Sequence, residues 1–451
     1  MHNLIALVLI LLCLGCIGFA FRRPSVLTIY LGTLSLFMLG YYGLPALLIE
    51  RSTLRYLPES EVSATVFMAL FFFIPLVCGV LYVGTRARKL PAMHLDVLDT
   101  GLTRYWWTGS ILSNALIIYY NSTRTLTFYQ VESIDNFLQD RSVFTGVIGF
   151  FVSLTEAIAA VYFAQALSRR EWRKILFSAA CLGIKLVLVM QGGQRMLFLT
   201  PILLLFAAIV AQGRFRMAGV ALASAVGALL IISPIMVAMR TGAWNSTQDI
   251  AAENFTYGSD PVDTILQSIV DRGDILQNTA VLKAYVDANG HVGSQYYLSI
   301  LALPIPRFLY PDKPYLFSDN GRMDGEASIL AWRLVVGNST GSLTAFGGII
   351  AYREGGWAWV FANGLLAGLM YGTLLTIFSR SGFIGQAFFA MGLAFWSVRK
   401  VPPSLFEGMA DVMTYLPVIL LLYVINWLAT PKNRAVMPAR PVGAPQVAHQ
   451  D

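Results

Sequence analysis

The chain has 451 residues, of which 56% are hydrophobic, 13% aromatic and only 13% charged. A soluble globular chain carries about 25% charged residues, so this composition leaves too little polar surface for a soluble fold, and it is too hydrophobic for a disordered chain. The net charge of +7 is scattered between apolar runs, a pattern that sets membrane topology and does not indicate nucleic-acid binding. We therefore expect an all-α polytopic membrane protein without a nucleic-acid partner.

Runs of about 20 apolar residues, the length that crosses a bilayer as a helix, predict eleven transmembrane helices. The predicted spans are residues 3–21, 25–49, 63–85, 105–121, 143–168, 175–190, 196–212, 217–238, 356–378, 382–398 and 414–429. The first run has no basic residue before it, which favours a retained span over a cleaved leader. Lys185 lies inside a span, so we expect it to face protein or water. The Gly-rich stretch Ser342–Tyr352 predicts a re-entrant hairpin or the start of a long tilted helix.

Lys and Arg residues predict the orientation of this bundle, because they collect on the cytoplasmic side of membrane proteins. In the eleven-span arrangement sixteen of them fall in the connections and tail on one side, and seven fall in the short connections opposite. This segregation predicts an outer N-terminus and a cytoplasmic C-terminus. The chain then divides into a bundle of about eight spans (1–238), a large outer segment (239–355), about three further spans (356–430) and a cytoplasmic tail (431–451).

The four cysteines, Cys13, Cys16, Cys78 and Cys181, all lie in apolar runs. Their spacing predicts neither a disulfide framework nor a zinc site, and we expect no metal or cofactor. No G-x-x-x-x-G-K-[ST] motif is present, so ATP-driven transport is not indicated.

The outer segment holds eight cationic and twelve acidic side chains, which suggests that an anionic ligand is held at the membrane surface. Arginine suits bidentate contact with phosphate, although ordinary salt bridging within a loop is the alternative.

The turn Gln191–Arg195 contains two glycines and begins a span from the outer side. Free N–H groups at a helix start together with Arg195 predict a diphosphate-binding site. The alternative is that Arg195 only anchors the helix at the membrane–water interface.

Two stretches within the outer segment carry further candidate site residues. Residues 296–314 predict a short interfacial helix followed by a proline-stiffened loop, which displays Arg307, Tyr310, Asp312 and Lys313 at headgroup depth. Residues 319–326 form a polar turn in which Arg322 stands close to Asp324 and Glu326. Either carboxylate could act as a general base; so could His291, although a lone loop histidine is more often simply solvated.

The eleven-span pattern, the Gly-Gly-x-Arg turn, the large outer segment and the P-x-P-R-x-x-x-P-x-K-P string at 304–314 together resemble the bacterial O-antigen and exopolysaccharide repeat-unit polymerases. The Gly-rich passage at 342–372 is similar to the segment that follows the outer loop in that family. The resemblance covers about residues 180–400.

The resemblance implies an integral-membrane glycosyltransferase of the bacterial inner membrane. Its substrate would be an undecaprenyl-diphosphate-linked oligosaccharide, and a chain-length-determining co-polymerase is a further partner that the family implies. The candidate bases are then Asp324, Glu326, Asp274 and His291. The candidate diphosphate ligands are Arg195, Arg307, Lys313, Arg322, Arg240, Arg272 and Tyr310, although the family's glycine spacing is not matched after Arg240 or Arg272.

Two other functions stay open. A transporter or flippase of lipid-linked sugars would have the same substrate class, but the sequence lacks an internal repeat and has few ionisable residues within spans, chiefly Glu156 and Lys185. An O-antigen ligase-type transferase would share both architecture and chemistry with a polymerase.

Overall fold

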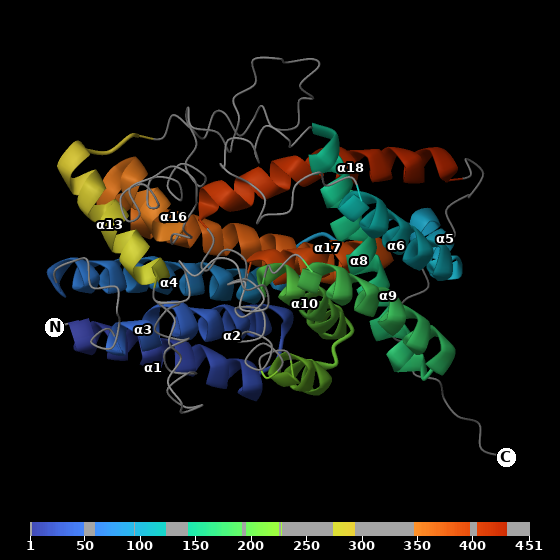
Figure 1. The fold of residues 1–451 in the computed structure, drawn as a ribbon, viewed down its shortest axis with the longest axis horizontal. Helices are drawn as coiled ribbons and strands as arrows, with labels where there is room; N and C mark the ends of the chain where they lie inside the picture. The colour runs from blue at the N-terminus through green and yellow to red at the C-terminus, as the bar shows by residue number, and fades with distance from the viewer. Residues whose placement is uncertain are drawn as a thin grey trace, which may run out of the picture.

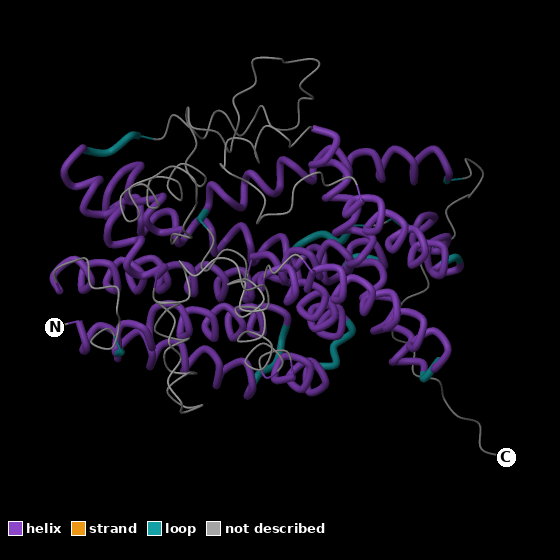
Figure 2. Tube along the Cα trace, in the orientation of Figure 1, coloured by secondary structure: helices purple, strands orange, loops and turns teal. Residues whose placement is uncertain are grey.

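The computed structural model describes residues 2–48, 59–93, 95–122, 143–191, 195–224, 227, 274–293, 347–396 and 404–430. Every regular element in these ranges is a helix (Figure 2). The protein is therefore an all-helical membrane protein, as the composition predicted. The four cysteines are free, with Cys13 and Cys181 buried and Cys78 exposed.

The helices run in a layered bundle, with most axes close to the long axis of the molecule (Figure 1). In chain order they are α1 (His2–Arg22), α2 (Val26–Met38), a π-helical turn (Leu39–Gly43), α3 (Leu44–Leu47), α4 (Glu59–Arg86), a 3-10 turn (Ala87–Lys89), α5 (Asp96–Arg104), α6 (Trp106–Ser122), α8 (Val143–Arg169), α9 (Trp172–Gln191), α10 (Arg195–Ala211), α13 (Asp274–Asn289), α16 (Gly347–Arg380), α17 (Phe383–Ala394) and α18 (Leu405–Ala429).

Within the described ranges, six segments are long and apolar enough to cross a membrane: Asn3–Arg22, Val26–Leu47, Ser60–Lys89, Phe151–Arg169, Gly347–Arg380 and Leu405–Ala429. Three shorter apolar helices, Thr200–Ala211, Phe215–Ser224 and Phe383–Ala394, coincide with further predicted spans. The count of eleven spans stays a prediction.

Helices α4 and α16 form the centre of the bundle, and glycine allows their backbones to meet. A Cβ placed on Gly79 of α4 would lie 2.7 Å from the carbonyl oxygen of Leu365 and 2.9 Å from the amide nitrogen of Leu369 on α16. From α16, Gly364, Gly368 and Gly372 face α4 at a four-residue spacing. Small residues at this spacing let membrane helices pack closely, so these glycines fix the position of α16.

Helix α16 begins nine residues before the predicted span 356–378, because Gly347 starts a short helical stretch that a break at Gly355 and Gly356 separates from the apolar run. The stretch Ser342–Tyr352 is thus, from Gly347 on, the start of a long helix. The break falls at Gly355 and Gly356, where Gly356 adopts a φ of +68°. That φ is in the left-handed region, which favours glycine.

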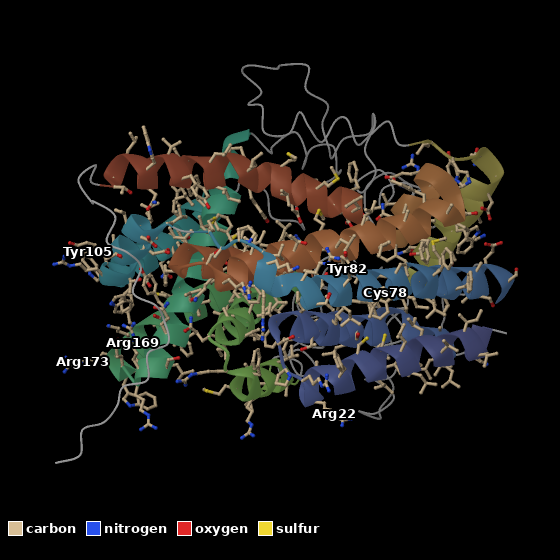
Figure 3. The ribbon with its side chains drawn as sticks, turned by 180° about the vertical axis from the view of Figure 1, so that it is seen from behind. Arg22, Cys78, Tyr82, Tyr105, Arg169 and Arg173 are labelled. Carbon is tan, nitrogen blue, oxygen red and sulfur yellow. The ribbon has the colours of Figure 1, made fainter. Side chains whose placement is uncertain are left out.

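Several of the connections that the charge pattern assigned to one side contact neighbouring connections. Arg214 donates to the Ser168 carbonyl oxygen at 3.2 Å, and Arg380 donates to that of Ala87. Figure 3 shows Tyr105, Arg169 and Arg173 at the end of the molecule away from α13.

Helix α5 is held at this same end. The Asp99 carboxylate accepts a hydrogen bond from the backbone N–H of Ile384 at 2.8 Å, which caps the start of α17. Asn426 of α18 accepts from the N–H of Val97 at 3.1 Å. The side chain of Ser381 accepts from the N–H of Met93 at 2.7 Å. Segments 285 to 329 positions apart in sequence are joined here.

Candidate functional site

A cluster of ionisable side chains joins three helices at the α13 end of the bundle. Lys283 of α13 lies 2.6 Å from Asp287 on the same helix, measured from Nζ to Oδ2. Its Nζ also lies 3.3 Å from Oε2 of Glu61, near the start of α4. The Lys283 side chain is only 9% exposed, so these two carboxylates surround a largely buried cation. We call Glu61, Lys283, Asp287, His291 and Tyr352 the α13 cluster.

Tyr352 brings α16 into this cluster. Its hydroxyl donates a 2.6 Å hydrogen bond to Oδ1 of Asp287, and the Lys283 ammonium lies 5.8 Å from the centre of its ring. An aromatic ring attracts a cation at this distance. Tyr352 therefore contacts both charges of the Lys283–Asp287 pair, and it links α16 to α13.

His291 follows α13 and is exposed. Its ring packs edge-on against the Tyr352 ring, with the centroids 5.4 Å apart and the planes at 82°. The break in α16 leaves room for it: a Cβ on Gly356 would lie 3.2 Å from His291 Nε2. Val292 and Gly293 then donate to the carbonyl oxygens of Arg353 and Glu354 at 2.9 and 3.1 Å. The histidine is held beside the cluster by backbone hydrogen bonds to α16.

An aromatic wall lies next to the cluster on the bundle side. The Trp357 ring lies 5.3 Å from Tyr352, 5.4 Å from Phe67 and 6.0 Å from Phe71. Trp359 donates from its indole N–H to the Glu354 carboxylate. Tyr352, Trp357 and Trp359 have the aromatic ring with a polar tip that is common at a boundary between apolar and wet surroundings.

The charges of the cluster stabilise one another. Burial raises the pKa of Asp287, but hydrogen bonds from Lys283 and Tyr352 and the nearby positive charge outweigh it, so this pKa lies below the ordinary 3.8. Burial likewise lowers the pKa of Lys283, and the hydrogen bonds and charges of Asp287 and Glu61 outweigh that effect, so this pKa lies above 10.5. Asp287 is therefore a carboxylate and Lys283 an ammonium across the physiological range.

Of the predicted site residues, the structure places only His291 with its side chain. Arg195 is the first residue of α10, as predicted for a helix start, and Asp274 is the first residue of α13; only the backbone of each is described. The other predicted residues lie outside the described ranges: Arg240, Arg272, Arg307, Tyr310, Lys313, Arg322, Asp324 and Glu326. Their proximity to His291 stays a prediction, as does the interfacial helix at 296–314.

A second ionisable pair lies within the bundle. Lys185 of α9 forms an ion pair with Glu156 of α8, whose side chain is 1% exposed while that of Lys185 is 11% exposed. The prediction that Lys185 faces away from lipid is confirmed. The two residues were recognised as the chief ionisable groups within spans, but their pairing requires the packing of α8 against α9.

Sequence reasoning missed most of the α13 cluster. The i, i+4 spacing of Lys283 and Asp287 is a helical ion-pair signal that could have been read from the sequence. Glu61 and Tyr352 carry no such signal, because they lie 222 and 65 positions from their partners. Only the docking of α13 on α4 and α16 brings them together.

The chain was compared with protein-family models, with curated proteins and with solved structures, and no match was found in any of the three.

Proposed function

We propose that this protein is a glycosyltransferase of the bacterial inner membrane that polymerises polyprenyl-diphosphate-linked oligosaccharide repeat units. The observation that carries the proposal is the α13 cluster, in which His291 stands exposed beside Tyr352 and a buried Lys283–Asp287 pair. It lies at the end of the bundle away from Arg169 and Arg173 (Figure 3), where the positive-inside rule places the outer side.

The proposed reaction needs a base and a site for diphosphate. The hydroxyl of the acceptor sugar attacks the anomeric carbon of the growing chain, the bond from that carbon to the diphosphate oxygen breaks, and the hydroxyl proton passes to a base. His291 is suited to this role because it is exposed and its ring is positioned by Tyr352. Arg195, Arg307 and Lys313 would stabilise the charge that develops on the leaving diphosphate. The energy lies in the donor linkage, so no nucleotide is needed.

A deletion strain complemented with variants tests the proposal. Replacing Arg195 or Arg307 by alanine should each lower polymerisation by roughly a hundredfold, because losing a charged contact costs a few kcal/mol. His291→Ala should lower it by roughly a hundredfold or more, because it removes the general base. The glycan ladder should collapse to single repeats that are still exported. Arg214→Ala, at the other end of the bundle, and Asn289→Ala, exposed on α13, are matched controls that should keep the ladder.

The purified protein supplies a direct check. Incubated with a lipid-linked repeat, the wild type should release undecaprenyl diphosphate in step with chain growth, and His291→Ala should not. A wild-type protein that forms no polymer and releases no diphosphate from the repeats of its own host would overturn the proposal.

Transport of lipid-linked sugars is the second candidate, and the Glu156–Lys185 pair favours it. Ionisable residues buried within spans often mark substrate or ion pathways. The test is to reconstitute the protein in liposomes with a fluorescent lipid-linked sugar. Movement of that sugar from one leaflet to the other by the wild type, and its loss in Glu156→Gln, would favour transport over polymerisation.

A further inference from the structure

Glu156 lies deep in the bundle, at the midpoint of its helix. Helix α8 runs from residue 143 to residue 169, so thirteen residues separate Glu156 from either end, or about 20 Å along the axis. Lys185 lies the same number of residues after Trp172, the start of α9. The ion pair therefore lies at mid-span, where a charged residue is costly.

Stability alone does not account for this pair. Removing two charges from water costs several kcal/mol for each ion, and well-packed apolar residues in their place are often as stable or more stable. The second carboxylate oxygen of Glu156, Oε2, is buried and accepts no hydrogen bond from the described residues. The geometry thus leaves half of a buried carboxylate for something other than Lys185.

Polar side chains lead from this pair toward one end of the bundle. The buried face of α9 carries Ser178 and Cys181 before Lys185, whereas Leu176 and Ile184 on its other face are exposed. The buried face of α6, which packs against both α8 and α9, is also polar. It carries Ser110, Ser113 and Asn114, and Asn114 lies beside Cys181. We call Ser110, Ser113, Asn114, Ser178 and Cys181 the polar column.

Several atoms of the polar column lack protein partners. The hydroxyl oxygens of Ser110 and Ser178 and the amide oxygen of Asn114 are buried and form no hydrogen bond with any described residue. Buried polar groups are normally satisfied by protein or by ordered water. Four such oxygens, counting Oε2 of Glu156, on three adjoining helices are the lining that a file of water molecules needs.

The column is one-sided. Ser178 lies only six residues into α9 and Ser110 four residues into α6, both near the end of the bundle that carries Arg169 and Arg173. Beyond Lys185, α9 continues as the apolar run 186–190, and α6 continues from Asn114 with the apolar residues 115–118. The unsatisfied oxygens of the column therefore lie between Glu156 and the α8–α9 turn.

We propose that the polar column is an aqueous access path from the α8–α9 turn to the Glu156–Lys185 pair, and that Glu156 exchanges a proton with bulk water along it. Proton uptake converts the carboxylate to a carboxylic acid beside the Lys185 ammonium, and proton release restores the ion pair. The ligand is the proton, carried by water. This inference does not depend on the proposed polymerase activity.

Few other ionisable groups face Glu156. Helices α10 and α17 also pack on α8. They carry no ionisable side chain between Met196 and Ala211 or between Phe383 and Ala394. Helix α6 contributes only tyrosines. Helix α9 contributes Arg173, Lys174 and Cys181 besides Lys185. Helix α8 itself contributes Arg169 in its last turn and Tyr162, whose hydroxyl donates to the Leu102 carbonyl oxygen. Among the described residues, Lys185 is thus the nearest charge to any proton on Glu156.

The native cysteines test the access path. In variants that keep a single cysteine, Cys181 lies in the column, whereas Cys13 is buried in the apolar core. Silver ion in chloride-free buffer should block Cys181, and a cysteine placed by Ser178→Cys, about tenfold faster than Cys13, because thiol reactivity follows access to water. Blocking is read by later maleimide labelling of the denatured protein. Equal, slow rates for all three positions would overturn the path.

Infrared difference spectra test the proton. The wild type should show a carboxylic-acid C=O band whose intensity changes as the bulk pH is varied. The band should be absent from Glu156→Gln and from the charge-neutral double variant Glu156→Gln/Lys185→Met. The double variant is the reference if the single variant does not fold. A wild-type spectrum identical to that of the double variant would overturn proton exchange, whether or not the protein polymerises sugars.

Discussion

The Tyr352 hydroxyl donates a 2.6 Å hydrogen bond to Oδ1 of Asp287 and thereby joins α16 to α13. Because Asp287 also binds Lys283, which reaches Glu61 on α4, this one bond completes a link among three helices. It also positions His291, whose ring packs on Tyr352. The link is therefore both a structural joint and the support of the proposed base.

Tyr352→Phe should loosen the docking of α13. The variant keeps the ring and removes one hydrogen bond to a partly exposed carboxylate, which we expect to cost about 1 kcal/mol. Amide hydrogen exchange within α13 should then be faster by roughly fivefold. Tyr285→Phe, on the exposed side of the same helix, is the control and should leave exchange unchanged. Equal exchange in the two variants would mean that the bond does not hold α13.

The docking of α13 should weaken at acid pH. The pKa of Asp287 is lower in the folded protein than its ordinary value of 3.8, so its contribution is present above that value and is lost as pH falls through the lower, folded-state pKa. The raised pKa of Lys283 has the opposite sign, and its contribution is lost only as pH rises above 10.5. Between these limits the link should be constant.

Trp357, which packs on Tyr352, offers a fluorescence readout of this titration once the other tryptophans are replaced. Its emission should change below about pH 4 in the wild type. In Asp287→Asn the low-pH step should be absent, since the group that titrates is gone. A step of equal size in Asp287→Asn would assign the transition to another group.

Much of this bundle is predictable from hydropathy, because each span is a local property of the sequence. Helix α1 ends at Arg22, one residue beyond the predicted span 3–21, and α10 begins at Arg195, as predicted. Lys185 is buried, in line with the expectation that it faces protein or water. The start of α16 is only partly predictable in this way, because the stretch Ser342–Tyr352 left a re-entrant hairpin and the start of a long helix as alternatives. The charged Arg353 and Glu354 interrupt the apolar run, but both are buried in the structure, because the break at Gly355 and Gly356 turns this part of α16 toward α13.

The candidate site is less predictable for a different physical reason. Single residues such as Glu61 and Tyr352 acquire their roles from contacts across α4, α13 and α16, and no spacing in the sequence encodes those contacts. His291 could be proposed because histidine suits proton transfer. That it contacts Tyr352 could not be foreseen, since the contact depends on the backbone hydrogen bonds from Val292 and Gly293 to α16.

The close contact between α4 and α16, the α4–α16 seam, predicts different effects on stability for substitutions at two glycines of α4. A methyl group on Gly79 would meet the Leu365 carbonyl oxygen at 2.7 Å, whereas on Gly84 it would meet only a side-chain carbon of Leu27 at 3.6 Å. Gly79→Ala should therefore destabilise the protein by about 1–3 kcal/mol, the usual cost of overpacking, and Gly84→Ala should not. The comparison is made by thermal unfolding in detergent, in which the loss of monodisperse protein gives the midpoint of each variant. Equal midpoints would show that the seam can spread at no cost.

The buried ion pair predicts a non-additive set of variants. Glu156→Gln leaves the Lys185 ammonium buried without its partner, and Lys185→Met does the same to the Glu156 carboxylate. Each should destabilise the protein by about 3–5 kcal/mol, whereas the double variant, which buries no charge, should unfold near the wild-type midpoint. Thermal unfolding of the four proteins in one detergent gives the coupling.

Activity then separates the two roles that the pair could have. If the ion pair only joined α8 to α9, the stable double variant would function like the wild type, since the packing is kept. If proton exchange on Glu156 contributes to function, the double variant should fold and yet be impaired, because it has no carboxylate at mid-span to take up the proton. We expect the second result, measured as glycan chain length per cell at matched protein levels. A full-length glycan ladder from the double variant would leave the pair a purely structural role.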